Sequence, residues 1–302
     1  MNGIINVYKE AGFTSFDVVA KLRGILHEKK IGHTGTLDPD ATGVLPVCIG
    51  QATKVCGLLT DKDKVYEAVL RLGCTTDTQD ASGKVLLDRS EGVSSLSEEE
   101  IRAAILSFIG DYAQIPPMYS ALKVGGKKLC DLAREGIEVE RKPRQVQIFD
   151  IQITDFSLPD ITLRVHCSKG TYIRTLCADI GERLSVGGHM RSLIRTRVSC
   201  FSLENAHTLA QIEELRDQGR LSELLLPVDC VFEQLPALVI GTSDESQKKL
   251  NNGNRLERED LTDPSPDAET DCRIYDTDGK FRAIYTWDET QHNYKCKKMF
   301  LS

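Results

Sequence analysis

Long apolar runs are absent from this 302-residue sequence, since no stretch approaches the roughly 20 residues that a membrane-spanning helix needs. Residues 1–6 also lack a basic region followed by an apolar stretch, which argues against export. The ten cysteines include no C-x-x-C pair, so we expect reduced thiols that mostly fill small core positions. These absences predict a cytoplasmic protein without a membrane segment.

An excess of basic residues is missing as well. The net charge is −7, from 38 Lys and Arg against 45 Asp and Glu, and this balance taken globally argues against nucleic-acid binding. Two segments depart from it: residues 164–197 hold seven basic and two acidic side chains, and residues 118–145 hold seven and four. Phosphate contact needs a basic face rather than a basic protein, so both segments are candidate phosphate-binding regions.

Length and composition predict one large domain and one small domain. The hydrophobic fraction of 40% and the charged fraction of 27% are ordinary for a globular protein. From about residue 236 the sequence becomes more polar and acidic. There, residues 272–275 and 280–287 flank the turn sequence DTDG, which predicts a β-hairpin, and residues 263–267 predict a loop. We therefore expect a domain over residues 1–235 and a β-rich domain over residues 236–302.

Periodicity and capping signals predict both helices and strands along the larger domain. Helices are expected to begin at Thr14 or Ser15 and at Ser97, and to cover residues 51–59, 129–134 and 209–226. One more helix is expected to run through residues 179–181. Strands are expected at 3–9, 44–49, 64–72, 146–154 and 161–167, and residues 75–83 are expected to form a loop.

The segment over residues 31–43 concentrates unusual residue types. Its glycines permit backbone angles that are closed to other residues, and Asp38 precedes a proline, where a helix does not readily continue. Most such clusters are surface turns. A carboxylate at the mouth of a shaped loop, with His33 five residues before it, is the alternative interpretation, a catalytic group. One histidine and no cysteine in the loop give no metal-binding pattern, so no metal is expected.

Sequence blocks in five places carry a resemblance to a known family. They are GHTGTLDP at 32–39 followed by ATG at 41–43, DKVY at 63–66, IPPMYSALK at 115–123, CSKGTYIR at 167–174 and GGHMRSLIRT at 187–196. Together they resemble the tRNA pseudouridine-55 synthases, the TruB family. One departure is that a family K-P-x-G motif is here KEAG at 9–12, with Glu10 in place of proline.

The resemblance implies a fold, an activity and a substrate. The fold is α+β, a mixed and mostly antiparallel sheet flanked by helices, followed by a small β-rich domain similar to PUA domains. The activity is isomerisation of uridine 55 in the T-loop of tRNA to pseudouridine on a flipped-out nucleotide, without cofactor or metal. Residues about 118–145 correspond to an arm that closes on the RNA stem-loop. The partner is the T-arm of tRNA, no protein partner is required, and a monomer is expected.

The resemblance also assigns roles to residues of this sequence. Asp38 is the catalytic nucleophile or base, Arg174 pairs with it and keeps it ionised, and Tyr66 stacks on the target base. Leu193 supports the base from its other side and His33 helps hold the flipped nucleotide. The remaining substrate-binding residues expected are Lys9, Lys169 and Tyr172.

Residue types alone leave most of these positions open. A tyrosine in a strand is ordinarily a core or edge aromatic, an arginine at a strand-to-helix junction is ordinarily a surface charge, and Leu193 fits a core position. Two other functions also remain open. A non-catalytic RNA-binding protein would not require Asp38, Tyr66 and Arg174 together. A nucleoside or glycoside hydrolase would require a second acid opposite Asp38, and Asp40 is its only near neighbour in sequence.

Overall fold

A nine-stranded sheet runs through the larger part of the molecule. The computed structural model describes residues 1–262 and 270–300. The strand order is β1-β3-β12-β4-β11-β10-β7, with β2 beside β3 and β13 beside β12. The strands are β1 Gly3–Lys9, β2 Ile31–His33, β3 Thr42–Ile49, β4 Lys64–Leu72, β7 Gly110–Gln114, β10 Arg144–Ser157, β11 Asp160–Cys167, β12 Gly188–Val198 and β13 Phe201–Ser202. Only β12 and β3 pair in parallel, so the sheet is mixed and mostly antiparallel, as expected.

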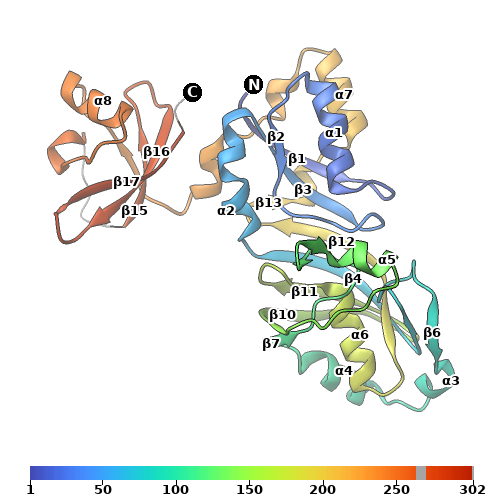
Figure 1. Cartoon of the computed structure of the whole chain (residues 1–302). Coiled ribbons are helices and arrows are strands. Elements are labelled where there is room, and N and C mark those ends of the chain that lie inside the picture. The colour runs from blue at the N-terminus through green and yellow to red at the C-terminus, as the bar shows by residue number, and fades with distance from the viewer. Residues whose placement is uncertain (263–269, 301–302) are drawn as a thin grey trace.

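Helices cover the two halves of this sheet separately. Figure 1 shows α1 and α7 on the half that holds β1 and β3, and α4 and α6 on the half that holds β10 and β11. The helices are α1 Ser15–Leu26, α2 Cys56–Thr60, α3 Ser90–Val93, α4 Glu98–Leu106, α5 Leu129–Arg134, α6 Ile173–Arg183 and α7 Leu209–Asp217. Short 3-10 helices lie at η1 Gly50–Val55, η2 Leu203–Asn205, η3 Leu221–Glu223 and η4 Val228–Phe232. Capping boxes begin α1, α4 and α7, because Thr14, Ser97 and Thr208 each exchange hydrogen bonds with the residue three positions on.

Two small hairpins project from the large sheet. One consists of β5 Cys74–Thr76 and β6 Val85–Asp88. The other consists of β8 Lys123–Val124 and β9 Lys127–Lys128, which lead directly into α5. We call residues 118–145, which include this second hairpin and α5, the arm. Its helix lies across the front of the molecule, over the middle of the sheet (Figure 1).

The C-terminal part has a four-stranded sheet of its own. Its strands, in the order β14-β15-β16-β17, are β14 Ala237–Val239, β15 Asp271–Tyr275, β16 Phe281–Asp288 and β17 Asn293–Met299, with α8 Asp244–Asn251 and the 3-10 helix η5 Arg258–Asp260 beside them. Phe281 and Phe300 lie 5.9 and 6.0 Å, ring centre to ring centre, from Phe232, which precedes this sheet. This aromatic contact belongs to a core cluster that the C-terminal sheet shares with β1, β3 and η1, so the two parts have a common apolar interface.

Most sequence-based expectations for the elements are confirmed. The strands at 3–9 and 64–72 and the helix at 129–134 have the expected bounds, and the hairpin after 271 is β15 and β16. The helix expected over 209–226 ends at Asp217, because Gly219 adopts a left-handed φ of +70° that interrupts it. The segment 51–59 begins as a 3-10 helix, and Thr75 and Thr76 belong to β5 rather than to a loop. The loop expected at 263–267 lies outside the described residues. Among the described helices, none is both long and apolar enough to cross a membrane.

Candidate active site

The loop between β2 and β3 presents Asp38 to a cavity. Thr34 donates its backbone N–H to the carbonyl of Pro46 at 3.2 Å, which ties the start of the loop to β3. Leu37 donates its backbone N–H to Oγ of Ser15 at 2.9 Å, which ties the residue before Asp38 to the first turn of α1. The N–H of Ala41 closes a turn on the carbonyl of Asp38 at 3.1 Å. The position of Asp38 is therefore fixed from both sides of the loop.

Lys9 contacts the backbone of the Asp38 loop and does not line the cavity. Its side chain is fully buried, and its Nζ donates to the carbonyls of Pro39 at 2.8 Å and Glu10 at 3.0 Å. Burial lowers the pKa of Lys9 to about 8, and the nearby Asp40 and Asp38 oppose that shift. An ammonium group held by two carbonyls inside the protein is not available to a phosphate. The structure thus replaces the expected substrate contact of Lys9 with a supporting role.

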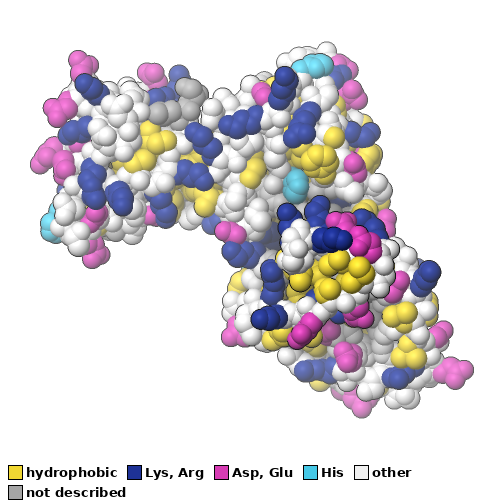
Figure 2. Space-filling view, viewed as in Figure 1, with side chains coloured by type: hydrophobic (Ala, Val, Ile, Leu, Met, Phe, Trp, Pro, Cys, Tyr) yellow, Lys and Arg dark blue, Asp and Glu magenta, His cyan; other side chains and the backbone are white. Residues whose placement is uncertain are grey.

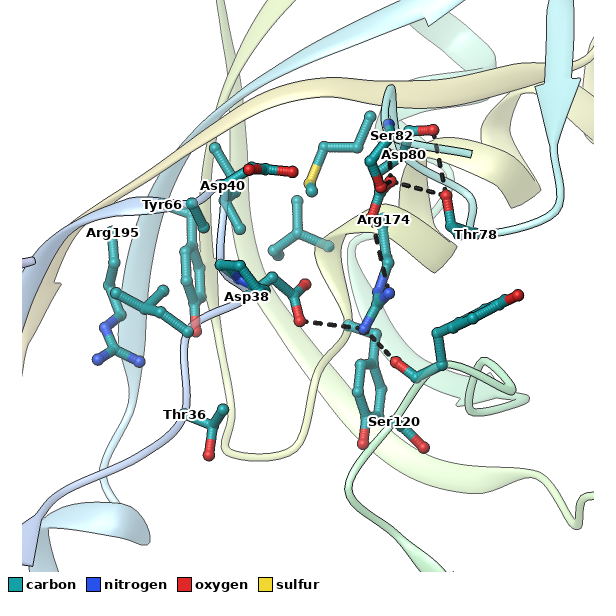
Figure 3. A pocket seen from close by; sticks show the side chains of 18 of the residues that line it. Thr36, Asp38, Asp40, Tyr66, Thr78, Asp80, Ser82, Ser120, Arg174 and Arg195 are labelled. Atoms are coloured by element: carbon teal, nitrogen blue, oxygen red, sulfur yellow. Dashed lines mark hydrogen bonds and ion pairs between the residues drawn. The ribbon is translucent and has the colours of Figure 1, made fainter. Parts of the chain in front are cut away.

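Arg174 and Asp38 meet at the cavity. Residue 174 lies in the first turn of α6, and its Nη2 is 3.1 Å from Oδ1 of Asp38 (Figure 3). The same nitrogen donates to the carbonyl of Tyr119 at 2.6 Å, so Arg174 also contacts the arm. The arginine is 5% exposed and the aspartate 34%, so the pair is open to the cavity only on the carboxylate side. A guanidinium in this arrangement orients the carboxylate and leaves one of its oxygens free for chemistry.

Asp80 is a second carboxylate on Arg174 that sequence reasoning did not identify. Its Oδ2 lies 3.6 Å from Nη1 of Arg174. Its other oxygen accepts hydrogen bonds from Thr78 Oγ1 at 2.7 Å and from the backbone N–H and Oγ of Ser82 at 3.0 and 2.6 Å. These bonds form an Asx turn. The hydroxyl residues two positions before and two positions after Asp80 were the sequence signal that could have predicted this turn. The loop after β5 therefore completes the surroundings of Arg174.

Burial, Arg174 and Asp80 have the largest effects on the charge state of Asp38. Removal from water in the recess raises the pKa of the Asp38 carboxyl; Arg174 lowers it, and Asp80 raises it further. We expected Arg174 to keep Asp38 ionised. Arg174 does act in that direction, but the net shift is upward because desolvation is the larger effect. The carboxylate is thus more basic than an exposed aspartate.

Tyr66 and Leu193 stand beside Asp38 on two adjacent strands. Both side chains are 8% exposed and both line the cavity, Tyr66 from β4 and Leu193 from β12. Figure 3 shows the Tyr66 ring between Asp38 and Arg195. Burial raises the pKa of the Tyr66 hydroxyl to about 12, so the phenol is neutral at physiological pH. The cavity offers an aromatic and an aliphatic surface next to a carboxylate.

The cavity has a volume of about 670 Å³, which is within the range of nucleotide-sized ligand sites. Its walls come from the Asp38 loop, the loop of Asp80, the arm and the strands β4 and β12. Tyr172 lines it from the residue before α6, where Gln114 holds its backbone N–H at 2.8 Å and its carbonyl at 2.9 Å. Within the described residues, no group of three or more His, Cys, Asp or Glu side chains could hold a metal ion.

Two other expected substrate-binding residues lie outside the cavity walls. His33 accepts a hydrogen bond at Nδ1 from the backbone N–H of Gly35 at 3.3 Å, and burial lowers its pKa. Lys169 is exposed, and its Nζ pairs with Asp61 at 2.8 Å. It directly precedes Gly170, which lines the cavity. The basic count over 164–197 also included Arg174 and Arg195, which are 5% and 1% exposed. These two cations are buried and do not contribute to a phosphate-binding face.

Comparison with known proteins identifies the family. A model of the N-terminal domain of TruB family pseudouridylate synthases matches residues 23–173, and one of the tRNA pseudouridylate synthase B C-terminal domain matches residues 174–233. The tRNA pseudouridine synthase B of Lachnoclostridium phytofermentans is 53% identical over the whole of both chains. That of Bacillus pumilus is 43% identical over 97% of this chain and 95% of its own.

A solved structure supports the same assignment. A chain of a Cbf5-Nop10-Gar1 complex superposes with a TM-score of 0.74 at 26% identity, over 99% of this chain and 85% of its own length. The sequence matches and the fold agree along nearly the full chain, and the resemblance of the five sequence blocks is confirmed. The chain belongs to the TruB family of pseudouridylate synthases, and it is an isomerase.

Proposed function

We propose that this enzyme isomerises uridine 55 in the T-loop of tRNA to pseudouridine, and that Asp38 starts the chemistry. The observation that carries the proposal is the contact of Asp38 with Arg174 at 3.1 Å, beside Tyr66 and Leu193 in one cavity. The name tRNA pseudouridine synthase B, borne by relatives 53% and 43% identical, supports tRNA as the substrate.

The reaction is balanced without a co-reactant. The N1–C1′ bond breaks, the uracil turns while it stays bound, and a C5–C1′ bond forms. N1 takes up a proton and the hydrogen on C5 leaves to water, so no electrons are gained or lost. In the proposal, the ionised Asp38 acts as the nucleophile or base that begins cleavage of the glycosidic bond, and Arg174 keeps it aimed at the substrate.

A uridine inside a folded loop has to be extruded before Asp38 can reach it. The Tyr66 ring is suited to stack on the extruded uracil, a contact worth roughly 1–3 kcal/mol per base. Leu193 supplies an apolar surface on the other side, and Tyr172, which lines the cavity wall, is proposed to bind the substrate as well. His33 at the end of β2 and Lys169, the exposed residue next to Gly170 of the cavity wall, are proposed to contact the flanking nucleotides.

The arm has features of a phosphate-binding element. In the register of β8 and β9, Lys123 lies directly opposite Lys128. Like charges at directly opposed positions destabilise a hairpin unless an anion lies between them. Lys and Arg side chains also gather on this face where the arm meets the rest of the molecule (Figure 2). We therefore propose that residues 118–145 close on the backbone of the T-arm and recognise its shape.

The same proposal covers domains, partners and location. Residues 1–235 form the catalytic domain and residues 236–302 a PUA-like domain with its own sheet. The enzyme acts as a monomer without an obligatory protein partner, on tRNA in the cytoplasm.

The test is tritium release from T-arm RNA labelled at C5 of uracil, comparing wild type with Asp38→Asn. We expect release by wild type, and no release by the variant with RNA binding retained, because Asn keeps the shape but not the charge. The labelled position is then mapped to uridine 55 in a full tRNA transcript. Binding without release by wild type would overturn the catalytic assignment, and release from another position would overturn the site assignment.

A further inference from the structure

The helix that carries Arg174 begins without a side-chain cap. α6 starts at Ile173, and the residue before it, Tyr172, is extended, with φ −97° and ψ 107°, and makes no capping hydrogen bond through its side chain. The helices α1, α4 and α7 each follow a Ser or Thr whose hydroxyl bonds to the backbone of the first turn. The direction of the first turn of α6, and with it the position of Arg174, therefore depends on contacts from other elements.

Gln114, the last residue of β7, supplies such a contact. Its Nε2 donates to the carbonyl of Tyr172 at 2.9 Å, and its Oε1 accepts from the N–H of Tyr172 at 2.8 Å. A backbone N–H can only donate and a carbonyl can only accept, so the two bonds also fix which way the amide is turned. The N–H of Leu176 bonds to the same carbonyl at 3.1 Å, which makes it the acceptor of a first-turn bond of α6. The Gln114 side chain is 1% exposed, so water hardly competes for these bonds.

Gln114 also lies at the root of the arm. It is paired with the first residue of β10, so the chain leaves the sheet after Gln114 and returns directly opposite it. Five residues further on, the carbonyl of Tyr119 accepts a hydrogen bond from Nη2 of Arg174 at 2.6 Å. The start of α6 is therefore connected to this segment at two points, from Gln114 to Tyr172 and from Tyr119 to Arg174.

We propose that Gln114 is a positioning residue for the isomerisation, which fixes the start of α6 and so aims Arg174 at Asp38. The inference rests on the proposed function, because it takes Asp38 as the group that starts the chemistry. Gln114 does not line the cavity, so it acts through Tyr172 and Arg174 rather than on the substrate. Nη2 of Arg174 lies between Asp38 and the carbonyl of the arm (Figure 3), and a small displacement of a group that orients a reacting atom is costly for catalysis.

The experiment is single-turnover tritium release from T-arm RNA at saturating enzyme, comparing wild type with Gln114→Met. Met is close to Gln in length and has no amide, so it removes both bonds to Tyr172 with little change in volume. We expect the rate to fall by about 10- to 100-fold. RNA affinity should change by less than about threefold, because phosphate contacts supply most of it. A merely structural role would lower the melting temperature and leave the folded variant at the wild-type rate, and that result would overturn the proposal.

A double-mutant cycle with Arg174→Lys tests the route through Arg174. If Gln114 acts by aiming this arginine, its loss matters little once the arginine is gone. The double variant Gln114→Met/Arg174→Lys is therefore expected to be slower than Arg174→Lys by less than about twofold. Losses that multiply in the double variant would also overturn the proposal, since they would mean that the two residues act independently.

Gln152→Met is the matched control. It is the same substitution at an exposed glutamine of β10, whose side chain donates to Asp150 at 2.8 Å, and it should keep the wild-type rate. If Gln114→Met fails to fold, Gln114→Asn takes its place. That variant keeps the amide but is one methylene shorter, so we expect a similar loss of rate, and a wild-type rate would contradict the proposal. An inactive wild type would instead refute the proposed function, so the two failures are distinguishable.

Discussion

Arg174 reaches Asp38 across 136 positions of sequence, with Nη2 3.1 Å from Oδ1. The same guanidinium contacts the carbonyl of Tyr119 in the arm and faces Asp80 from its other nitrogen. A planar group with several fixed donors can serve these three acceptors together, and a lysine ammonium on a flexible stem cannot. Arg174 therefore affects both the charge state of Asp38 and the position of the arm.

Arg174→Lys is expected to reduce the single-turnover rate of tritium release by about 100-fold or more, a typical loss when one preorganised charged donor is removed. RNA affinity should change much less, because the arginine is buried. The matched control is Arg191→Lys, at an arginine that lines the same cavity but pairs with Asp160. Wild-type turnover in Arg174→Lys would count decisively against the proposed role of the pair.

Asp80→Asn should shift the pH dependence of the reaction. The negative charge of Asp80 raises the pKa of Asp38, so its removal lowers that pKa and keeps Asp38 ionised to lower pH. The acid limb of kcat/KM for tritium release is therefore expected to move to lower pH, while the plateau falls because Arg174 loses one of its partners. Asp40→Asn removes another charge that raises the same pKa but does not touch Arg174. It should shift the limb and preserve the plateau; a shift to higher pH in either variant would be inconsistent with this electrostatic account.

Local signals predicted the elements of this fold well. The strand over Lys64–Leu72 alternates in polarity and the helix over Leu129–Arg134 carries a clear apolar pattern, and both have the expected bounds. One prediction was wrong because of a single backbone feature, the left-handed Gly219 that ends α7 early. Capping and periodicity are properties of neighbouring residues, so a sequence exposes them directly.

Only part of the candidate site could be predicted from the sequence. Asp38 and Arg174 could be paired before the structure because the family resemblance named both. Asp80 was hidden in a polar loop, and its contact with Arg174 depends on how that loop returns to β12. Charge counting also could not tell that Lys9 and Arg195 point inward, because burial is decided by how the strands pair. Contacts between distant segments are therefore what the structure added.

Lys9→Met tests whether Lys9 is a buried support. Its pKa is about 8 in the folded protein and about 10.4 in an unfolded chain, so the unfolded state binds more protons between these values. The contribution of this group to the free energy of unfolding consequently rises with pH through that window, by on the order of 3 kcal/mol. We expect the stability of wild type relative to the variant to grow from pH 8 to pH 10 in urea denaturation, with Lys29→Met as the control for loss of an exposed lysine. A difference that stays flat or declines over this range would mean that Lys9 is not buried as an ammonium.

The double variant Lys123→Gln/Lys128→Gln tests whether the arm binds phosphates. Each neutralised phosphate adds about 0.7 to 0.9 to the slope of log affinity against log salt, so losing two contacts should lower the slope by about 1.5. Affinity for T-arm RNA is expected to fall at low salt, and the single-turnover rate at saturating enzyme should remain near that of wild type, because neither lysine lines the cavity. Arg220→Gln removes a basic side chain that lies outside the arm and pairs with Glu223, and it serves as the control for a change in net charge. An unchanged salt slope in the double variant would mean that the opposed lysines of β8 and β9 do not contact the RNA backbone.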